Sequence, residues 1–302
     1  MATKSKPKVY NHETFISLFN SIARHRHRYE VFQDFVFMSA IAIHNAICPT
    51  ETLEQEYLAM VAKYKRDEVD KICELLANLI NLLEVEPRDV LGTLYMELEL
   101  GNTNNGQFFT PHEISVLMAK LVYGDVLERV ANDELPFIRA SEPACGAGGM
   151  ILAFANEMMK KGVNPAYKLC VQCIDIDRLA GFMCYLQLSL WHIPAEIIIG
   201  NTLTLEFRET YYTPAYYLGQ WDTRLRLRKV LDMCKALPDT VEVSKDTSEQ
   251  ANSEIEAKTD TKTQTNTHHT NTITHTKTKT HVATDGLHQV DFFSEFDLKI
   301  DH

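Results

Sequence analysis

The sequence predicts an α/β fold in which a parallel sheet follows a helical N-terminal part. Apolar side chains recur at helical spacing over residues 10–85. Residues 137–204 then alternate short apolar runs with helical stretches, and such units place parallel strands in one sheet with helices on its faces. A glycine turn, from Glu142 to Gly149, joins the first of these strands to its helix.

Residues 1–100 are predicted to form the N-terminal helical domain. Pro87 suits the first turn of its last helix, which should run to about Leu100. The earlier helices are indicated by apolar residues spaced three and four apart over 32–43, 53–61 and 69–83.

Residues 101–238 are predicted to form the sheet domain. A loop rich in glycine and asparagine opens it, and a helix is expected from Pro111 to Tyr123 with Thr110 as its N-cap. The predicted strands lie near 137–141, 169–174 and 196–200, with helices near 149–161 and 178–191.

The end of the sheet domain is less regular. Residues Glu206 to Thr210 do not have the pattern of a buried strand, and Leu225 to Cys234 suggest one helix. Residues 239–284 are of low complexity and rich in threonine, so we expect a disordered linker. A tail, residues 285–302, follows it.

The glycine turn is the strongest functional signal in the chain. Gly146 and Gly148 let the backbone come close to a ligand, and the helix start behind them offers free N–H groups. A nucleotide-like cofactor is therefore the leading expectation. The alternative is that these glycines serve packing alone, as they do in many α/β turns.

Composition limits the choice of partners and compartment. The net charge of −11 has the wrong sign for a protein that grips DNA alone, although Arg24, Arg26 and Arg28 could contact phosphate or form a solvated helix end. No apolar run is long enough for a membrane span and no signal peptide is visible, so a soluble cytoplasmic protein is expected.

Seven cysteines lie in mostly apolar segments, which fits reduced buried thiols better than disulfides. Cys170 and Cys173 have zinc-like spacing. In a strand, however, residues three apart point to opposite faces, and no second pair follows. The sequence therefore predicts no metal site.

Four segments together resemble a known family. These are residues 106–111 (GQFFTP), residues 142–149 (EPACGAGG), the strand that ends at Asp175, and the strand that precedes Asn201. In this order they resemble the N6-adenine DNA methyltransferases, in particular the modification subunit of bacterial type I restriction-modification systems. The resemblance covers about residues 10–205. It implies an incomplete Rossmann-like methyltransferase core that uses S-adenosylmethionine to methylate DNA.

The resemblance also implies a cofactor site. Backbone groups around Ala144, Gly146 and Gly148 would hold the methionine part of S-adenosylmethionine, and Asp175 would hold the ribose diol. Asn201 would read the adenine, and the methionine end would be covered by Phe109, Thr110 and Pro111. Glu142 stands where the family usually has Asp, and Asn201 stands where an acid is commoner.

The catalytic tetrapeptide of the family, Asn-Pro-Pro-Tyr or Asn-Pro-Pro-Phe, occurs nowhere in the 302 residues. Thr213, Pro214 and Tyr216 form a degenerate candidate, although a loop with aromatic packing is the favoured interpretation. The sequence therefore leaves two alternatives open. A partner subunit completes the enzyme, or the chain is a non-catalytic protein that binds restriction-modification partners, DNA or the sliding clamp. In type I systems a separate specificity subunit recognises the target.

The tail suggests the sliding clamp as a partner. Gln289, Phe292 and Phe293 are spaced as in the short peptides with which bacterial proteins hold the replication sliding clamp. The alternative is a tail that folds back on the helical domain.

Overall fold

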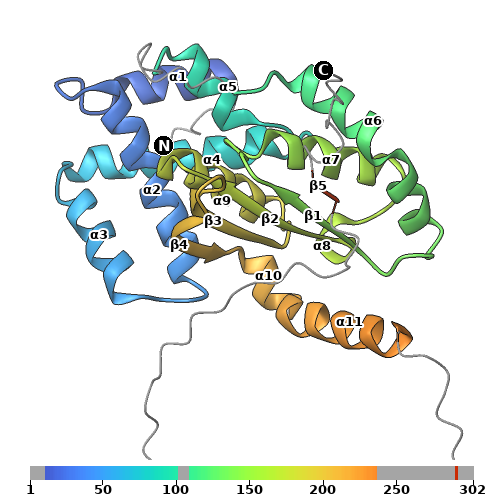
Figure 1. Ribbon diagram of the computed structural model, residues 1–302. Helices are drawn as coiled ribbons and strands as arrows, with labels where there is room; N and C mark the ends of the chain where they lie inside the picture. The colour runs from blue at the N-terminus through green and yellow to red at the C-terminus, as the bar shows by residue number, and fades with distance from the viewer. Residues whose placement is uncertain (1–10, 101–108, 237–289, 292–302) are drawn as a thin grey trace, which may run out of the picture. The chain divides into compact units, whose positions relative to one another are not determined.

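A computed structural model of the chain describes residues 11–100, 109–236 and 290–291 (Figure 1). The chain divides into two compact units, one of Met1–Leu225 with His288–His302 and one of Arg226–Leu287. The predicted division at residue 100 stays a prediction. The predicted linker 239–284 lies outside the described residues.

Four helices open the first unit: α1 (His12–Ser21), α2 (Arg28–Asn45), α3 (Glu51–Val61) and α4 (Arg66–Leu83). The predicted helical N-terminal part is confirmed. Aromatic side chains fill its core, where Phe15 and Phe35 meet edge to face with 5.8 Å between ring centroids. Asn11 begins α1 with a capping box, in which its side chain and that of Thr14 each accept the other's backbone N–H.

Two further helices differ at their ends from the prediction. α5 (Val90–Glu97) begins after Asp89, whose carboxylate accepts the N–H of Gly92 at 2.7 Å, and so it starts three residues after Pro87. α6 (His112–Ala131) has Pro111 at its N-cap position with no side-chain cap, so the predicted cap by Thr110 is wrong. α6 also continues past Tyr123, because buried Leu127 and Val130 keep its inner face apolar.

The predicted α/β class is confirmed. β1 (Ile138–Glu142), β2 (Leu169–Asp175) and β3 (Ala195–Asn201) are parallel neighbours, in the register that pairs Ile138 with Leu169 and Val171 with Ala195. α7 (Gly149–Lys160) and the short α8 (Pro165–Lys168) connect β1 to β2, and α9 (Arg178–Leu190) connects β2 to β3.

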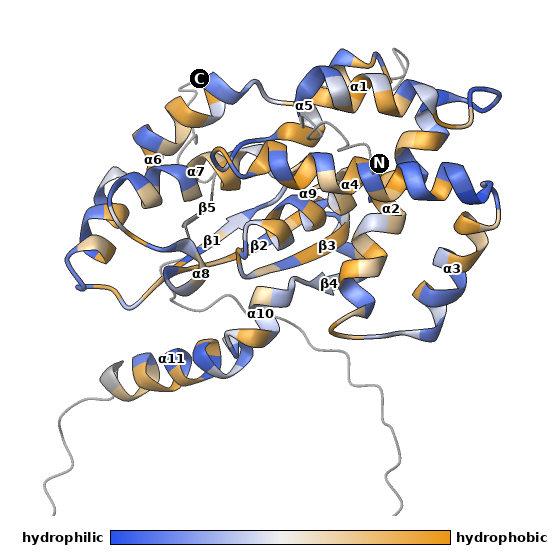
Figure 2. Ribbon diagram, turned by 180° about the vertical axis from the view of Figure 1, so that it is seen from behind, coloured by the Kyte–Doolittle hydropathy of each residue, from blue (hydrophilic) through white to orange (hydrophobic). Residues whose placement is uncertain are grey.

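The core lies where α9 meets the sheet. α9 packs on β2 and β3 while α2 packs on α9, so every residue of α9 from Leu179 to Ser189 is buried. Figure 2 shows hydrophobic residues gathered on α9 and the strands beside it. No helix in the described ranges is both long enough and apolar enough to cross a membrane.

The chain reverses direction after β3. β4 (Glu206–Tyr212) is antiparallel to β3 and forms the edge of the sheet, with α10 (Pro214–Leu218) directly after it. The sequence was right that this segment is no buried strand, since its residues are exposed or half-buried. It missed an edge strand whose polar side chains face solvent. The predicted helix after it is α11 (Trp221–Ala236).

A short strand from the tail forms the other edge. β5 (Val290–Asp291) is parallel to β1, with Val290 opposite Ala140, which gives the strand order β4-β3-β2-β1-β5. Figure 1 shows β5 beside β1. The predicted clamp-binding residues Gln289, Phe292 and Phe293 lie outside the described residues.

Candidate functional site

The glycine turn lies at the carboxyl end of β1 and leads into α7. Gly146 has φ 53° and Gly148 has φ 88°, the left-handed region that favours glycine, and Gly148 is the N-cap of α7. The N–H of Cys145 donates to the carbonyl of Ile174 at 2.9 Å, which fastens the turn to β2. The first N–H groups of α7 thus begin at the edge where parallel α/β sheets bind ligands.

Asp175, at the end of β2, holds this turn in place. One carboxylate oxygen accepts the N–H of Gly146 at 2.8 Å and the other accepts the N–H of Asp177 at 2.9 Å. Burial raises the pKa of Asp175, although these backbone donors oppose the rise. Its two oxygens therefore organise the turn, and the predicted contact with a ribose diol stays a prediction.

Phe109 is brought against the same turn. A Cβ on Gly146 would lie 3.3 Å from the Phe109 ring, and that ring meets Tyr95 edge to face at 5.3 Å. Phe109, Thr110 and Pro111 also line a cavity of about 600 Å³. The predicted role of these three residues in covering the methionine end stays a prediction, and the cavity has the size of a pocket for a nucleotide-like ligand.

Gln187, a buried residue that the sequence analysis did not single out, supports the site together with Asp89. The side-chain oxygen of Gln187 accepts the N–H groups of Val90 and Leu91, and its nitrogen donates to Asp89 and to the carbonyl of Ala147, all within 3.0 Å. Burial raises the pKa of Asp89, which lines the cavity. The sequence signal that could have found Gln187 is a glutamine on the apolar face of a predicted helix, because a buried polar group needs hydrogen-bond partners.

The other predicted cofactor residues also lie at the carboxyl end. Glu142 is buried and accepts the N–H of Ala144 at 3.3 Å. Asn201 ends β3, and its side-chain oxygen accepts the N–H groups of Leu203 and Thr204. Thr202 beside it donates to the carbonyl of Pro143 at 2.6 Å, which joins the loop after β3 to the glycine turn.

The degenerate catalytic candidate lies at the wrong end of the sheet. Thr213 is fully buried, and its hydroxyl accepts the N–H of Ala195 at 2.9 Å and donates to the carbonyl of Ile193 at 2.8 Å. Ala195 begins β3, which runs parallel to β1, so Thr213 marks the amino end. The candidate Thr213, Pro214 and Tyr216 therefore lies at the end of the sheet opposite the glycine turn, because β4 runs antiparallel to β3.

A closer match to the tetrapeptide escaped the sequence analysis. Asn164, Pro165, Ala166 and Tyr167 differ from Asn-Pro-Pro-Tyr at the third residue alone. They form the start of α8, directly before β2. This segment too lies at the amino end of the sheet, so it does not meet the glycine turn either.

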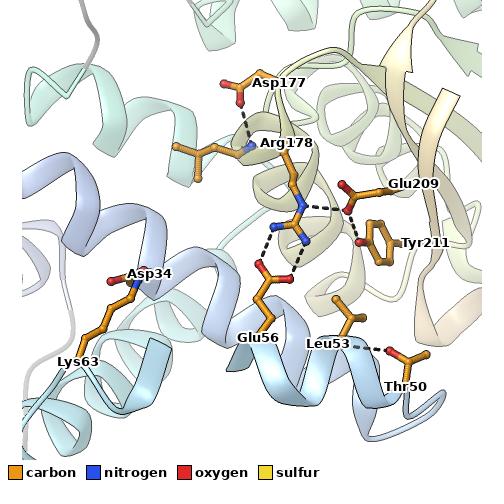
Figure 3. A network of polar contacts seen from close by, with 10 residues as sticks. Asp34, Thr50, Leu53, Glu56, Lys63, Asp177, Arg178, Glu209 and Tyr211 are labelled. Carbon is orange, nitrogen blue, oxygen red and sulfur yellow. Dashed lines mark hydrogen bonds and ion pairs between the residues drawn. The ribbon is translucent and has the colours of Figure 1, made fainter. Parts of the chain in front are cut away.

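An ion-pair network supports the start of α9 (Figure 3). Arg178 follows Asp177 and makes two hydrogen bonds to Glu56 of α3, at 2.6 and 2.9 Å, and a third to Glu209 of β4 at 2.9 Å. Its guanidinium also lies 4.8 Å from the centre of the Phe182 ring. The network ties the helical part and the edge strand to the loop that carries Asp175.

Comparisons with known proteins give a matching family model and a similar solved structure. Residues 87–216 match the family model described as N-6 DNA methylase, which confirms the predicted resemblance over this segment. A solved structure assigned as a class I S-adenosylmethionine-dependent methyltransferase of Listeria monocytogenes is similar at 17% identity with a TM-score of 0.29. That similarity covers 55% of this chain and 52% of the Listeria chain, about half of its length. No curated protein matches the chain.

Proposed function

We propose that the glycine turn of this chain binds S-adenosylmethionine for adenine-N6 methylation of DNA, and the match of residues 87–216 to the N-6 DNA methylase family model supports this. The observation that carries the proposal is the turn itself. Two left-handed glycines, Gly146 and Gly148, stand at the carboxyl end of β1, and Phe109, which lies beside Gly146, also lines the 600 Å³ cavity.

The surrounding residues suit the parts of this cofactor. The N–H groups at the start of α7 favour a carboxylate such as that of the methionine part. Phe109 offers an apolar wall, and Asn201 carries an amide at the carboxyl end of β3 that can read an adenine edge. Asp175 keeps the turn in its binding conformation through the N–H of Gly146.

Methyl transfer needs one more component. An adenine amine is a weak nucleophile, and an amide or carbonyl oxygen must accept its protons near the methyl donor. Both degenerate tetrapeptides, at 164–167 and 213–216, lie at the amino end of the sheet. We therefore propose that catalysis by this chain depends on a completing polypeptide.

The second candidate is a non-catalytic protein that binds cofactor and acts on restriction-modification partners, DNA or the sliding clamp. The position of Thr213 favours it, because the chain's own catalytic candidate is locked into the core.

Titration calorimetry with S-adenosylmethionine and with its demethylated product tests the cofactor proposal. We expect binding by the unaltered protein, weakening of about tenfold or more in Phe109→Ala, and unchanged affinity in Tyr216→Phe, the control at the opposite end of the sheet. The absence of heat on folded protein would overturn the proposal.

Transfer of labelled methyl to unmodified bacterial DNA tests the dependence on a partner. We expect transfer only when native cell extract accompanies the purified protein. Transfer by the protein alone would contradict the need for a completing polypeptide. Cofactor binding without transfer in either condition would support the non-catalytic alternative.

A further inference from the structure

Three cysteines meet beneath the glycine turn. Cys145 comes from the turn, Cys173 from β2 and Cys184 from α9, and their sulfur atoms all lie within 4.8 Å of one another. Cys173 and Cys184 are fully buried, and Cys145 is 6% exposed. Within the described ranges, these three cysteines form a group whose ligand atoms are close enough to share a metal ion.

The spacing of the sulfurs approaches that of a thiolate metal site. A metal bonded to three sulfurs at about 2.3 Å holds them roughly 3.7–4.0 Å apart. Sulfurs that already lie within 4.8 Å need only small side-chain shifts to reach that geometry. Cys145 and Cys173 sit on neighbouring, hydrogen-bonded segments, because the Cys145 N–H donates to Ile174. Two of the three ligands are therefore held by backbone.

The donor set selects the class of ion. Thiolates are soft ligands that favour ions such as Cu⁺, Zn²⁺ and Cd²⁺ over Mg²⁺ or Ca²⁺, which need oxygen. Cys184 approaches Gly148 so closely that a Cβ there would lie 2.9 Å from its sulfur. The site is thus small and packed, and it suits a bare ion with few further ligands.

We propose that Cys145, Cys173 and Cys184 form a three-thiolate site for a soft metal ion, placed directly behind the glycine turn. Binding joins the turn, β2 and α9 through one ion. The ion replaces thiol protons, so its binding releases protons to solvent. The three cysteines do not line the cavity, although Cys145 belongs to the proposed cofactor turn and Cys184 packs against Gly148.

Titration of the reduced full-length protein with Cd²⁺ tests the site. We expect one ion per chain, a sulfur-to-metal charge-transfer absorption, proton release and a raised melting temperature. Cys173→Ser and Cys184→Ser should lose stoichiometric binding. Cys170→Ser is the matched control, because Cys170 is a buried thiol of the same strand outside the cluster. Cys73→Ser tests adventitious binding by an exposed thiol.

X-ray absorption of the loaded unaltered protein gives a result that does not depend on folding of the variants. Three sulfur neighbours around the ion support the proposal. One or two sulfur neighbours around the ion would overturn the proposal. Binding that persists in Cys173→Ser, or no stoichiometric binding by the reduced protein, would also overturn it, and the three thiols would then serve only to pack the core.

Discussion

The two ends of the same parallel sheet have opposite characters. At the carboxyl end, Gly146 and Gly148 form a left-handed turn beside Phe109, which lines a cavity, and Asp175 accepts the N–H of Gly146 from the next strand. At the amino end, the hydroxyl of Thr213 closes a buried hydrogen-bond pair with Ile193 and Ala195. Side chains at one end arrange a surface for a ligand, whereas a motif-like segment at the other end only completes the core.

The comparison shows that strand direction decides which motif residues can act together. The segments 142–149 and 213–216 are both similar to parts of one family's site. β4 runs antiparallel to β3, so the second segment arrives at the end opposite the first. A sequence match therefore gives the identity of a side chain, and topology gives its position.

The largest effect is expected from the buried amide that supports the carboxyl end. Gln187→Leu removes four hydrogen bonds and leaves buried N–H groups at Val90 and Leu91 without their acceptor. We expect the free energy of unfolding to fall by about 3–5 kcal/mol, measured by urea denaturation. Gln172→Leu, which loses one half-buried contact to Glu196, should cost about 1 kcal/mol or less. Equal losses would contradict the role of Gln187.

The next effect comes from the turn itself. Gly148→Ala combines a left-handed backbone with a Cβ placed 2.9 Å from the Cys184 sulfur. We expect the free energy of unfolding, measured by urea denaturation, to fall by about 2–4 kcal/mol. Gly162 is the matched control, since its φ is 76° but no atom lies within 4 Å of the added Cβ. Gly162→Ala should lose about 1–2 kcal/mol. The difference between the two losses measures the effect of the contact with Cys184. Equal losses would show that Cys184 moves aside without cost.

Two threonines separate stability from binding. Thr213→Val keeps the shape but leaves the Ala195 N–H unsatisfied, so we expect a loss of about 1–3 kcal/mol with unchanged affinity for S-adenosylmethionine. Thr202→Val breaks the hydrogen bond to Pro143 at the other end of the sheet. It should lower the free energy of unfolding by less than about 1 kcal/mol and weaken the binding of S-adenosylmethionine. Calorimetry and denaturation on both variants check this. Weaker cofactor binding in Thr213→Val would contradict the proposal that only the carboxyl end of the sheet contributes to binding.

The smallest effect is a dependence on pH. Burial raises the pKa of Asp175 above its ordinary value of 3.8, so ionisation is less favourable in the folded state than in the unfolded state. The Asp175 contribution to stability is therefore present below pH 3.8 and is lost as the pH rises through the folded pKa. Asp175→Asn should remove this fall from the curve of unfolding free energy against pH.

Asp133 provides a control of opposite sign. A hydrogen bond from Lys168 lowers the pKa of Asp133, so its contribution is present above pH 3.8 and is lost as the pH falls through the folded pKa. Asp133→Asn should therefore flatten the curve on its acid side. The same direction of change in both variants would contradict the assignment of burial as the cause for Asp175.

Much of the fold follows from local patterns in the sequence. The helices over 12–83 and the three parallel strands have clear periods, and all of them form. The prediction was wrong where one side chain or tertiary contact sets an end, as Asp89 does for α5 and as buried Leu127 does for the extension of α6. It missed β4 because an edge strand needs no apolar face.

The candidate site divides in the same way. The sequence by itself determined the strand–turn–helix at 138–160 and the chemistry of Gly146 and Gly148, because a left-handed turn depends on the residues within it. The tertiary structure alone decided that Thr213 lies far from that turn, that Gln187 supports it and that three cysteines meet beneath it. Those outcomes depend on strand direction and on packing between distant segments, which no local pattern encodes.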